Sequence, residues 1–238
     1  MKINEIYGPV KQGEGKSLGR WVVFVRLALC NLACVWCDTP YTWNWKGTKF
    51  QHPDKYDPDE EIHEVLTAAV AGQVLSLGQK VRAVVFSGGE PLLQQRELVP
   101  ICALLQMEGF WIEIETNGTV VPTAELLDVV NQINCSPKLQ NSGPDNKKTM
   151  RIKDRALQQL ASSEKVNFKF VVATDDDVQE IVELVDAYNL KEVYLMPEGR
   201  TKEELLRHEA STRKICAERG FHFSPRQHII DFGNVRGV

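Results

Sequence analysis

The sequence predicts an α/β protein whose core is an open, partial TIM-like barrel of about six mostly parallel strands. Segments rich in β-branched and aromatic residues alternate with stretches whose apolar residues recur at helical spacing. This alternation is typical of parallel strands joined by right-handed helical crossovers. The strands are too few to close an eight-stranded barrel, so we expect an unclosed sheet with ligands at the strands' carboxyl ends.

The expected strands are the apolar segments at residues 21–27, 81–87, 111–115, 129–135, 166–172 and 192–196. Helices are expected between and after them, at residues 59–77, 98–107, 123–128, 154–160, 177–188 and 202–219. Pro58 stands just before the first helix, and Thr174 offers an N-cap oxygen ahead of the helix at 177–188. Residues 141–153 are polar and basic with Gly and Pro, which predicts a mobile loop whose basic side chains are mostly solvated.

Composition narrows the class of protein. The chain has 238 residues, 43% of them hydrophobic and 25% charged, which suits one domain spanning residues 1–238 with a sizeable core. The net charge of −4 argues against general nucleic-acid binding. Neither a secretory signal nor an apolar run of membrane-spanning length is found. We therefore expect a cytoplasmic protein that binds neither nucleic acid nor a membrane.

Three of the six cysteines are packed into eight residues, as Cys30-Asn-Leu-Ala-Cys34-Val-Trp-Cys37. Thiolates so close in sequence indicate a metal site, and iron–sulfur clusters usually take four such ligands. Three cysteines would leave one iron open to a small molecule. A structural zinc site would need a fourth ligand, and His52 has no recognisable ligand spacing. The scattered cysteines 102, 135 and 216 are expected to be small core residues.

Polar motifs follow the second, third and fourth expected strands. In Ser87-Gly88-Gly89-Glu90-Pro91, the glycines permit close backbone approach to a ligand, and Glu90 can accept from an ammonium group. Residues 115–119 and 136–138 place short polar side chains at the same edge of the sheet. A simple turn is the alternative for each motif alone. Their recurrence on neighbouring strands favours one shared binding crevice.

Two further features point to the ligand. Gln12 and Glu14, in a glycine-rich stretch, match the donor and acceptor edge of a pterin-like heterocycle, although a glycine turn is the simpler interpretation. Arg26 interrupts an apolar strand, and burying it unpaired is costly. A substrate carboxylate is a suitable partner, because a guanidinium binds carboxylates bidentately.

Residues 30–37 and the Gly-Gly-Glu-Pro element resemble the radical S-adenosylmethionine (SAM) superfamily. The resemblance implies a [4Fe–4S] cluster on Cys30, Cys34 and Cys37, SAM chelating the open iron, and Trp36 near its adenine. It also implies cleavage of SAM to a 5′-deoxyadenosyl radical. The SAM-binding residues implied in this way are Gly89, Glu90, Thr116, Asn117, Ser136, Pro137, Lys138 and Met196.

Within that superfamily, residues 12–15, the Asp38-Thr39 that follows the cysteines, and residues 136–138 resemble the 7-carboxy-7-deazaguanine synthase family. Members convert 6-carboxy-5,6,7,8-tetrahydropterin to 7-carboxy-7-deazaguanine with loss of ammonia, a step of queuosine-type biosynthesis. The resemblance implies hydrogen abstraction at C6 of this small-molecule substrate and Mg2+ bound at Thr39. A departure, Gly8-Pro9-Val10-Lys11, precedes residue 12. The implied substrate-binding residues are Gln12, Gly13, Glu14, Arg26, Ser87, His228 and Val238.

The same resemblance implies a homodimer and an electron donor such as flavodoxin or ferredoxin. The alternative enzyme is a glycyl-radical-enzyme activating enzyme, which has similar size and cysteine spacing but no use for Gln12, Glu14 and Arg26. A structural metal module that binds no SAM is the non-enzymatic alternative. The final residues, 232–238, mix apolar residues with glycines, which predicts a tail folded back on the barrel. The tail then either binds substrate or only packs there.

Overall fold

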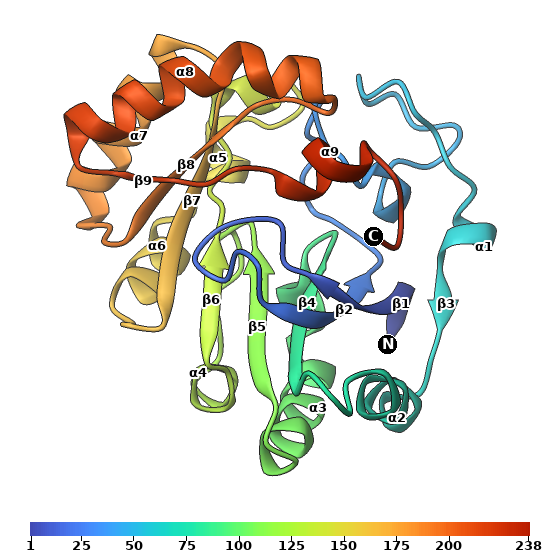
Figure 1. Cartoon of the computed structure of the whole chain (residues 1–238). Helices are drawn as coiled ribbons and strands as arrows, with labels where there is room; N and C mark the ends of the chain where they lie inside the picture. Colours follow the sequence, from blue (N-terminus) through green and yellow to red (C-terminus); the bar gives the residue numbers. More distant parts are fainter.

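One nine-stranded sheet organises the structure, a computed structural model that describes residues 1–238 (Figure 1). Its strand order is β3-β1-β2-β4-β5-β6-β7-β8-β9, and all neighbours from β2 to β9 are parallel. The sheet does not close, as predicted. The strands are β1 (Lys2–Lys11), β2 (Trp21–Leu27), β3 (His63–Glu64), β4 (Ala83–Gly88), β5 (Trp111–Thr116), β6 (Gln132–Cys135), β7 (Val166–Val172), β8 (Val193–Pro197) and β9 (His222–Phe223).

The six predicted strands correspond to β2 and β4–β8, whereas β1 was not predicted. β1 pairs antiparallel with β2, and its pairing register shifts between Tyr7 and Val10, around the Gly8-Pro9 departure. A bulge of this kind interrupts the alternation of side chains that marks a strand in a sequence. The two short edge strands, β3 and β9, offer too few residues for any periodic signal.

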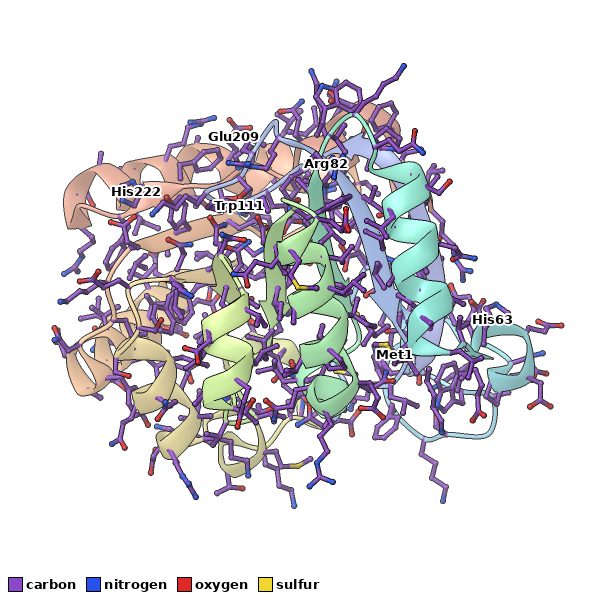
Figure 2. The ribbon with its side chains drawn as sticks, turned by 90° about the horizontal axis from the view of Figure 1, so that it is seen from below. Met1, His63, Arg82, Trp111, Glu209 and His222 are labelled. Carbon is purple, nitrogen blue, oxygen red and sulfur yellow. The ribbon has the colours of Figure 1, made fainter.

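Helices α2, α3 and α4 lie side by side on the outer face of the sheet, as Figure 2 shows from below. The single helix predicted at 59–77 is wrong: α1 and α2 are separated there by β3, whose His63 pairs with Ile3 of β1. The other predicted helices are present. The helices are α1 (Pro58–Glu61), α2 (Thr67–Leu77), α3 (Gln95–Met107), α4 (Ala124–Val129), α5 (Lys148–Arg151), α6 (Asp154–Ala161), α7 (Asp175–Tyr188), α8 (Lys202–Arg219) and α9 (Gln227–Phe232).

Residues 141–153 are more ordered than the predicted loop. They include α5, and Ser142, Asn146 and Arg151 are buried. Arg151 donates to Glu180 at 2.5 Å and to the Lys138 carbonyl at 2.9 Å, so the prediction of solvated basic residues is wrong at this position. The lysines of the segment are exposed, as predicted.

The two faces of the sheet have opposite character. The outer face and its helices form an apolar cluster of 35 buried residues, including Ile112 and Ile114 of β5. The inner face carries buried polar side chains, because residues two apart on a strand share a face. These inward residues of the central strands are the buried Glu113, Gln132, Asn134, Asn167 and Lys169 and the half-buried Glu115. The stretch at residues 12–17 packs against them.

The N-cap predicted ahead of the helix at 177–188 is present. Thr174 caps α7 in a capping box with Asp177, as its position before the helix predicts. None of the helices combines the length and the apolar character needed to cross a bilayer.

Candidate active site

An open cavity lies at the carboxyl ends of β2 and β4–β8. It is lined by all seven predicted substrate-binding residues, Gln12, Gly13, Glu14, Arg26, Ser87, His228 and Val238. The predicted metal ligands Cys30, Cys34, Cys37 and Thr39 line it too. Of the predicted SAM-binding residues, the cavity lining contains Gly89, Thr116, Asn117, Ser136, Lys138 and Met196, but not Glu90 or Pro137.

The cysteine loop, which follows β2, is held by a distant segment. The Ala33 amide donates to Asn146 Oδ1 at 2.8 Å, and the Val35 amide donates to the Ser142 carbonyl at 3.0 Å. Burial raises the pKa of all three thiols, that of Cys34 to about 12. Because free thiolates are disfavoured there, the loop suits a metal centre that compensates their charge.

His52 is not available as a fourth zinc ligand. Its Nε2 lies 2.9 Å from the Cys37 carbonyl oxygen, and its Nδ1 accepts from the Asp54 amide at 3.2 Å. Both ring nitrogens are therefore engaged with the backbone. Three sulfurs without a fourth protein ligand fit an iron–sulfur cluster with an open iron better than they fit structural zinc.

Gly88 and Gly89 bring β4 into direct contact with the cysteine loop. A Cβ on Gly89 would lie 1.9 Å from the Leu29 carbonyl oxygen, and one on Gly88 would lie 2.2 Å from the Leu27 carbonyl oxygen. No side chain fits at either position. The glycines thus allow this turn to pack directly on the backbone that leads into Cys30, and the expected approach of a ligand to them stays a prediction.

Glu90 lies behind the cavity wall, next to Gly89. It is fully buried and accepts from the Leu92 amide at 2.9 Å, the Thr116 hydroxyl at 2.8 Å and the Asn117 amide at 2.6 Å. Burial raises its pKa in spite of these bonds. The carboxylate therefore orients the end of β5, and its contact with an ammonium group of SAM stays a prediction.

Lys138 and Trp36 lie close together in the cavity wall. Lys138 Nζ donates to the Ser136 hydroxyl at 2.8 Å and lies 5.5 Å from the centre of the Trp36 ring. The Trp36 indole N–H donates to the Asn141 carbonyl at 2.9 Å. These side chains present a cation, a hydroxyl and a flat ring to one region, a combination suited to a carboxylate, a ribose and a base.

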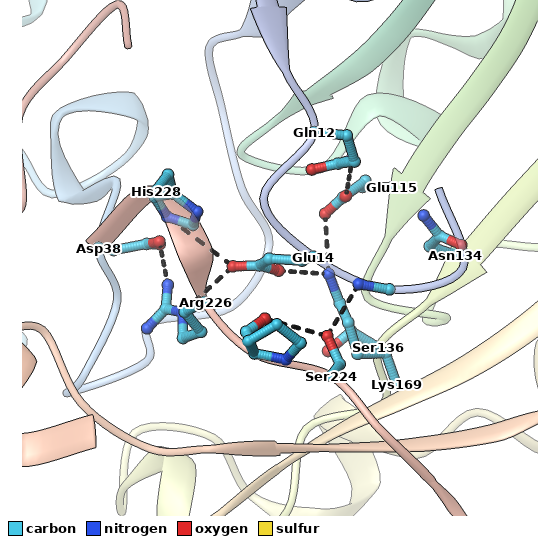
Figure 3. Close-up of polar contacts among 12 residues, drawn as sticks. Gln12, Glu14, Asp38, Glu115, Asn134, Ser136, Lys169, Ser224, Arg226 and His228 are labelled. Atoms are coloured by element: carbon cyan, nitrogen blue, oxygen red, sulfur yellow. Dashed lines mark hydrogen bonds and ion pairs between the residues drawn. The ribbon is translucent and has the colours of Figure 1, made fainter. Parts of the chain in front are cut away.

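Glu14 is the centre of a buried charge network (Figure 3). Its carboxylate accepts from Lys169 Nζ at 2.5 Å and from Arg226 Nε at 3.1 Å. Burial opposes its ionisation, but the two cations outweigh burial and hold the pKa of Glu14 well below its usual range. Lys169 also lies 3.3 Å from Glu115, which accepts from the Gln12 amide at 3.0 Å. Lys169 thereby fixes both predicted heterocycle-binding side chains.

The partner of Arg26 is a carboxylate of the protein itself. Its Nε donates to Glu5 Oε1 at 2.7 Å and its Nη2 to the Tyr7 hydroxyl at 2.8 Å, both on β1. The sequence argument that a charge in an apolar strand needs a partner is met by these residues. Arg26 also lines the cavity, and its guanidinium has further N–H donors beyond those used by Glu5 and Tyr7. Its contact with a substrate carboxylate through these donors stays a prediction.

Asp38, Arg226 and His228 join the end of the chain to the cysteine loop. Arg226 Nη2 donates to Asp38, and His228 Nε2 lies 3.9 Å from Glu14 Oε1. Ligand atoms of Glu14, Asp38 and His228 lie within 4.8 Å of one another, a spacing that suits a cation. However, Arg226 already pairs with both carboxylates. This group therefore holds the terminal segment in place.

Glu113 is the least satisfied member of the polar inner face. Its Oε1 accepts from Asn134 at 2.6 Å and from Gln12 at 3.0 Å, whereas its Oε2 has no hydrogen-bond partner. Burial, together with the charge of Glu115, raises the pKa of Glu113 to about 7 from an ordinary 4.5. The folded protein consequently keeps a proton that the unfolded chain has released by pH 5 to 6.

We expect Glu113→Gln to reduce the pH dependence of stability. Because the raised pKa favours the protonated native state, the free energy of unfolding should fall as pH rises from 4.5 to about 7 and level off above it. The contribution is on the order of 3 kcal/mol. Urea unfolding of both proteins at pH 5 and pH 8 measures it. An identical pH dependence in the variant would show that Glu113 ionises normally.

Several residues of the site were not predicted. Lys169 interrupts the apolar strand β7 just as Arg26 interrupts β2, and the same argument from buried charge could have found it. Glu113 and Glu115 alternate with isoleucines, a pattern that indicates a polar inner face. Arg226 and Asn146 carry no comparable signal, because their roles depend on contacts across more than 100 residues.

Comparison with known proteins agrees with this geometry. Residues 26–139 match the model of the radical SAM superfamily. The chain is 37% identical to the 7-carboxy-7-deazaguanine synthase of Pyrobaculum aerophilum, over 100% of this chain and 97% of that protein. The chain belongs to the 7-carboxy-7-deazaguanine synthase family.

Other members of the 7-carboxy-7-deazaguanine synthase family are similar over nearly the whole length. The Rhodopirellula baltica synthase is 34% identical over 96% of this chain and 85% of its own. The crystal structure of QueE from Escherichia coli superposes with a TM-score of 0.71 at 24% identity, covering 95% of this chain and 94% of that one. Streptococcus suis SuiB, bound to S-adenosylmethionine, has a TM-score of 0.54 at 14% identity over 82% of this chain and 48% of its own, and shares the fold.

Proposed function

We propose that this enzyme converts 6-carboxy-5,6,7,8-tetrahydropterin to 7-carboxy-7-deazaguanine and ammonia. The observation that carries the proposal is a single cavity that holds the cysteine triad together with Gln12, Glu14 and Arg26. Full-length similarity to 7-carboxy-7-deazaguanine synthases supports it. The alternative, activation of a glycyl-radical enzyme, gives these three residues no role and is less well supported.

The residues divide the work in the following way. Cys30, Cys34 and Cys37 would hold a [4Fe–4S] cluster, which supplies the electron that cleaves SAM and so starts radical chemistry. Gly89, Ser136 and Lys138 would position SAM, with Lys138 binding its carboxylate. Gln12 and Glu14, fixed by Glu115 and Lys169, would hold the pterin ring so that its C6 hydrogen faces the SAM site.

Incubation of the anaerobic enzyme with SAM, a reductant, Mg2+ and 6-carboxytetrahydropterin tests the proposal. The expected products are the deazaguanine and ammonia in equal amounts, without net consumption of SAM. Stoichiometric 5′-deoxyadenosine with no deazapurine would overturn the assignment and favour the activating enzyme.

Thr39 is the proposed Mg2+ ligand. Its Oγ1 lies 3.6 Å from Cys37 Sγ at the cavity wall, and a hydroxyl that donates its proton to sulfur keeps its lone pairs for a hard cation. Thr39→Ala should raise the Mg2+ concentration for half-maximal activity without loss of iron. Thr42→Val, which removes a hydroxyl that donates to the Thr39 carbonyl, is the matched control. An unchanged Mg2+ response in Thr39→Ala would place the ion elsewhere.

The terminal segment is proposed to close the substrate side of the cavity. Asn234, Val235 and Val238 line the cavity, and Arg236 fastens the segment. Its Nη1 and Nη2 pair with both oxygens of Glu61, at 3.0 and 2.9 Å, and its guanidinium lies 3.6 Å from the centre of the Tyr41 ring. A C-terminal tag distinguishes two roles of the tail, because it removes the free carboxylate of Val238. The tag should raise KM if this carboxylate binds the substrate, and should leave KM unchanged if the tail only packs.

Arg236→Ala should raise the KM for the pterin roughly tenfold, because an ion pair and a cation–π contact that hold the segment are lost. Iron content and kcat should stay unchanged. Arg213→Ala is the matched control, since Arg213 also pairs with an acid, Glu209, and lies 3.7 Å from the centre of the Phe223 ring. Equal KM values in the two variants would show that the contacts of Arg236 with Glu61 and Tyr41 have no part in substrate binding.

The contiguous core of 35 residues supports a single domain over residues 1–238. We also propose a homodimer and a one-electron donor protein such as flavodoxin or ferredoxin. Light scattering and reduction assays with each candidate donor test these two points.

A further inference from the structure

Two of the three cysteine sulfurs receive a hydrogen bond from a buried side chain outside the cysteine loop. Asn146 Nδ2 donates to Cys34 Sγ at 3.3 Å, and the Trp43 indole N–H donates to Cys37 Sγ at 3.4 Å. Asn146 is 3% and Trp43 5% exposed. The third sulfur, of Cys30, lies 3.9 Å from Asn117 Nδ2, which makes its shorter bond, 2.9 Å, to Asn31.

We propose that Asn146 and Trp43 set the reduction potential of the cluster through these N–H···S hydrogen bonds. The inference rests on the cysteine ligands of the proposed function and goes beyond it, since the two residues touch neither SAM nor substrate in that assignment. It assigns them a role in electron acceptance that is separate from ligand binding.

The orientation of both donors is fixed by other contacts. Asn146 Oδ1 accepts from the Ala33 amide at 2.8 Å, and this bond fixes the side-chain amide so that its NH2 group points to Cys34 Sγ. The Trp43 ring packs in T-shaped contacts with Phe50 and His52, whose ring centres are 5.7 and 6.0 Å away. A donor held in this way needs no reorganisation when charge on the sulfur changes.

The direction of the effect follows from electrostatics. Reduction adds one negative charge to the cluster and its thiolates, and an N–H dipole aimed at sulfur stabilises the more negative state. Both donors therefore raise the reduction potential. Burial strengthens the effect, because water cannot replace a lost donor at these sites.

The experiment measures the midpoint potential of the reconstituted holoenzyme by redox titration followed by electron paramagnetic resonance, without SAM. Asn146→Leu removes the donor at nearly the same volume without adding a charge, and Trp43→Phe removes the indole N–H together with its five-membered ring. We expect each variant to shift the reduction equilibrium roughly three- to tenfold toward the oxidised state. Tenfold equals about 59 mV for a one-electron couple.

Trp111→Phe is the matched control, because the Trp111 indole N–H has no hydrogen-bond partner. Its midpoint should equal that of the wild type. Unchanged or raised midpoints in Asn146→Leu and Trp43→Phe would overturn the inference. Loss of the cluster in both variants would overturn it too, because the two residues would then only support the cysteine loop. A wild type that binds no cluster would instead refute the proposed function.

Discussion

Cys34→Ala is expected to abolish both the bound cluster and all cleavage of SAM. Three thiolates are the minimum that leaves a single open iron, so two cysteines would leave two irons without protein ligands. Iron and sulfide analysis, the visible absorbance of the reconstituted protein and the formation of 5′-deoxyadenosine measure the result. The same outcome is expected for Cys30→Ala and Cys37→Ala.

Cys102→Ala is the control for this prediction. Cys102 is a free cysteine that is fully buried in the apolar cluster behind the sheet, and it does not line the cavity. Its substitution should cost about 1 kcal/mol of stability and leave the iron content unchanged. If Cys102→Ala lost the cluster as completely as Cys34→Ala, the ligand assignment would be wrong.

Lys169→Met is expected to have the second-largest effect, on stability and on turnover. It leaves the carboxylates of Glu14 and Glu115 without their shared cation, and removing one partner of a buried ion pair costs about 3–5 kcal/mol. Because Gln12 and Glu14 would then be displaced, we expect kcat/KM to fall on the order of a hundredfold. Urea unfolding and steady-state kinetics measure the two effects. Lys169→Arg keeps the positive charge and should retain much of the stability and of the activity.

Lys16→Met is the matched control. Lys16 pairs with Glu192 at 3.2 Å, but both side chains are 47% exposed, so the pair contributes little to stability. A loss in Lys169→Met no larger than that in Lys16→Met would show that the buried network neither stabilises the fold nor orients the substrate residues.

The sequence predicted the parts of the fold that depend on local patterns. Parallel strands such as β4 are buried on both faces and begin as a continuous apolar run, and α8 occupies the very residues predicted for it. β1 escaped because its bulge at Gly8-Pro9 breaks the alternation, and β3 because pairing with β1 overrides the helical propensity of its neighbourhood.

The site residues that belong to short sequence motifs were predictable. The ion pairs between residues far apart in the sequence were not. Cys30, Gly89 and Ser136 belong to short motifs, and the structure places them around one cavity. Glu14 was identified, but its pairing with Lys169 and Arg226 was not, because the partners lie 155 and 212 residues away. Such pairings follow from the register of the strands and the path of the terminal segment, which no local pattern specifies.

The dependence of the cysteine loop on residues 142–146 has a consequence for the order of events during synthesis. The backbone of Ala33 and Val35 is fixed only when a segment more than 100 residues later has folded against it. Closing a loop of that length is slow compared with local folding, so the loop acquires its final shape late. We therefore expect the cysteine loop to reach its final shape only after β1–β6 and Asn146 have left the ribosome. Cluster insertion is then expected to follow synthesis of the first 146 residues and not to accompany it.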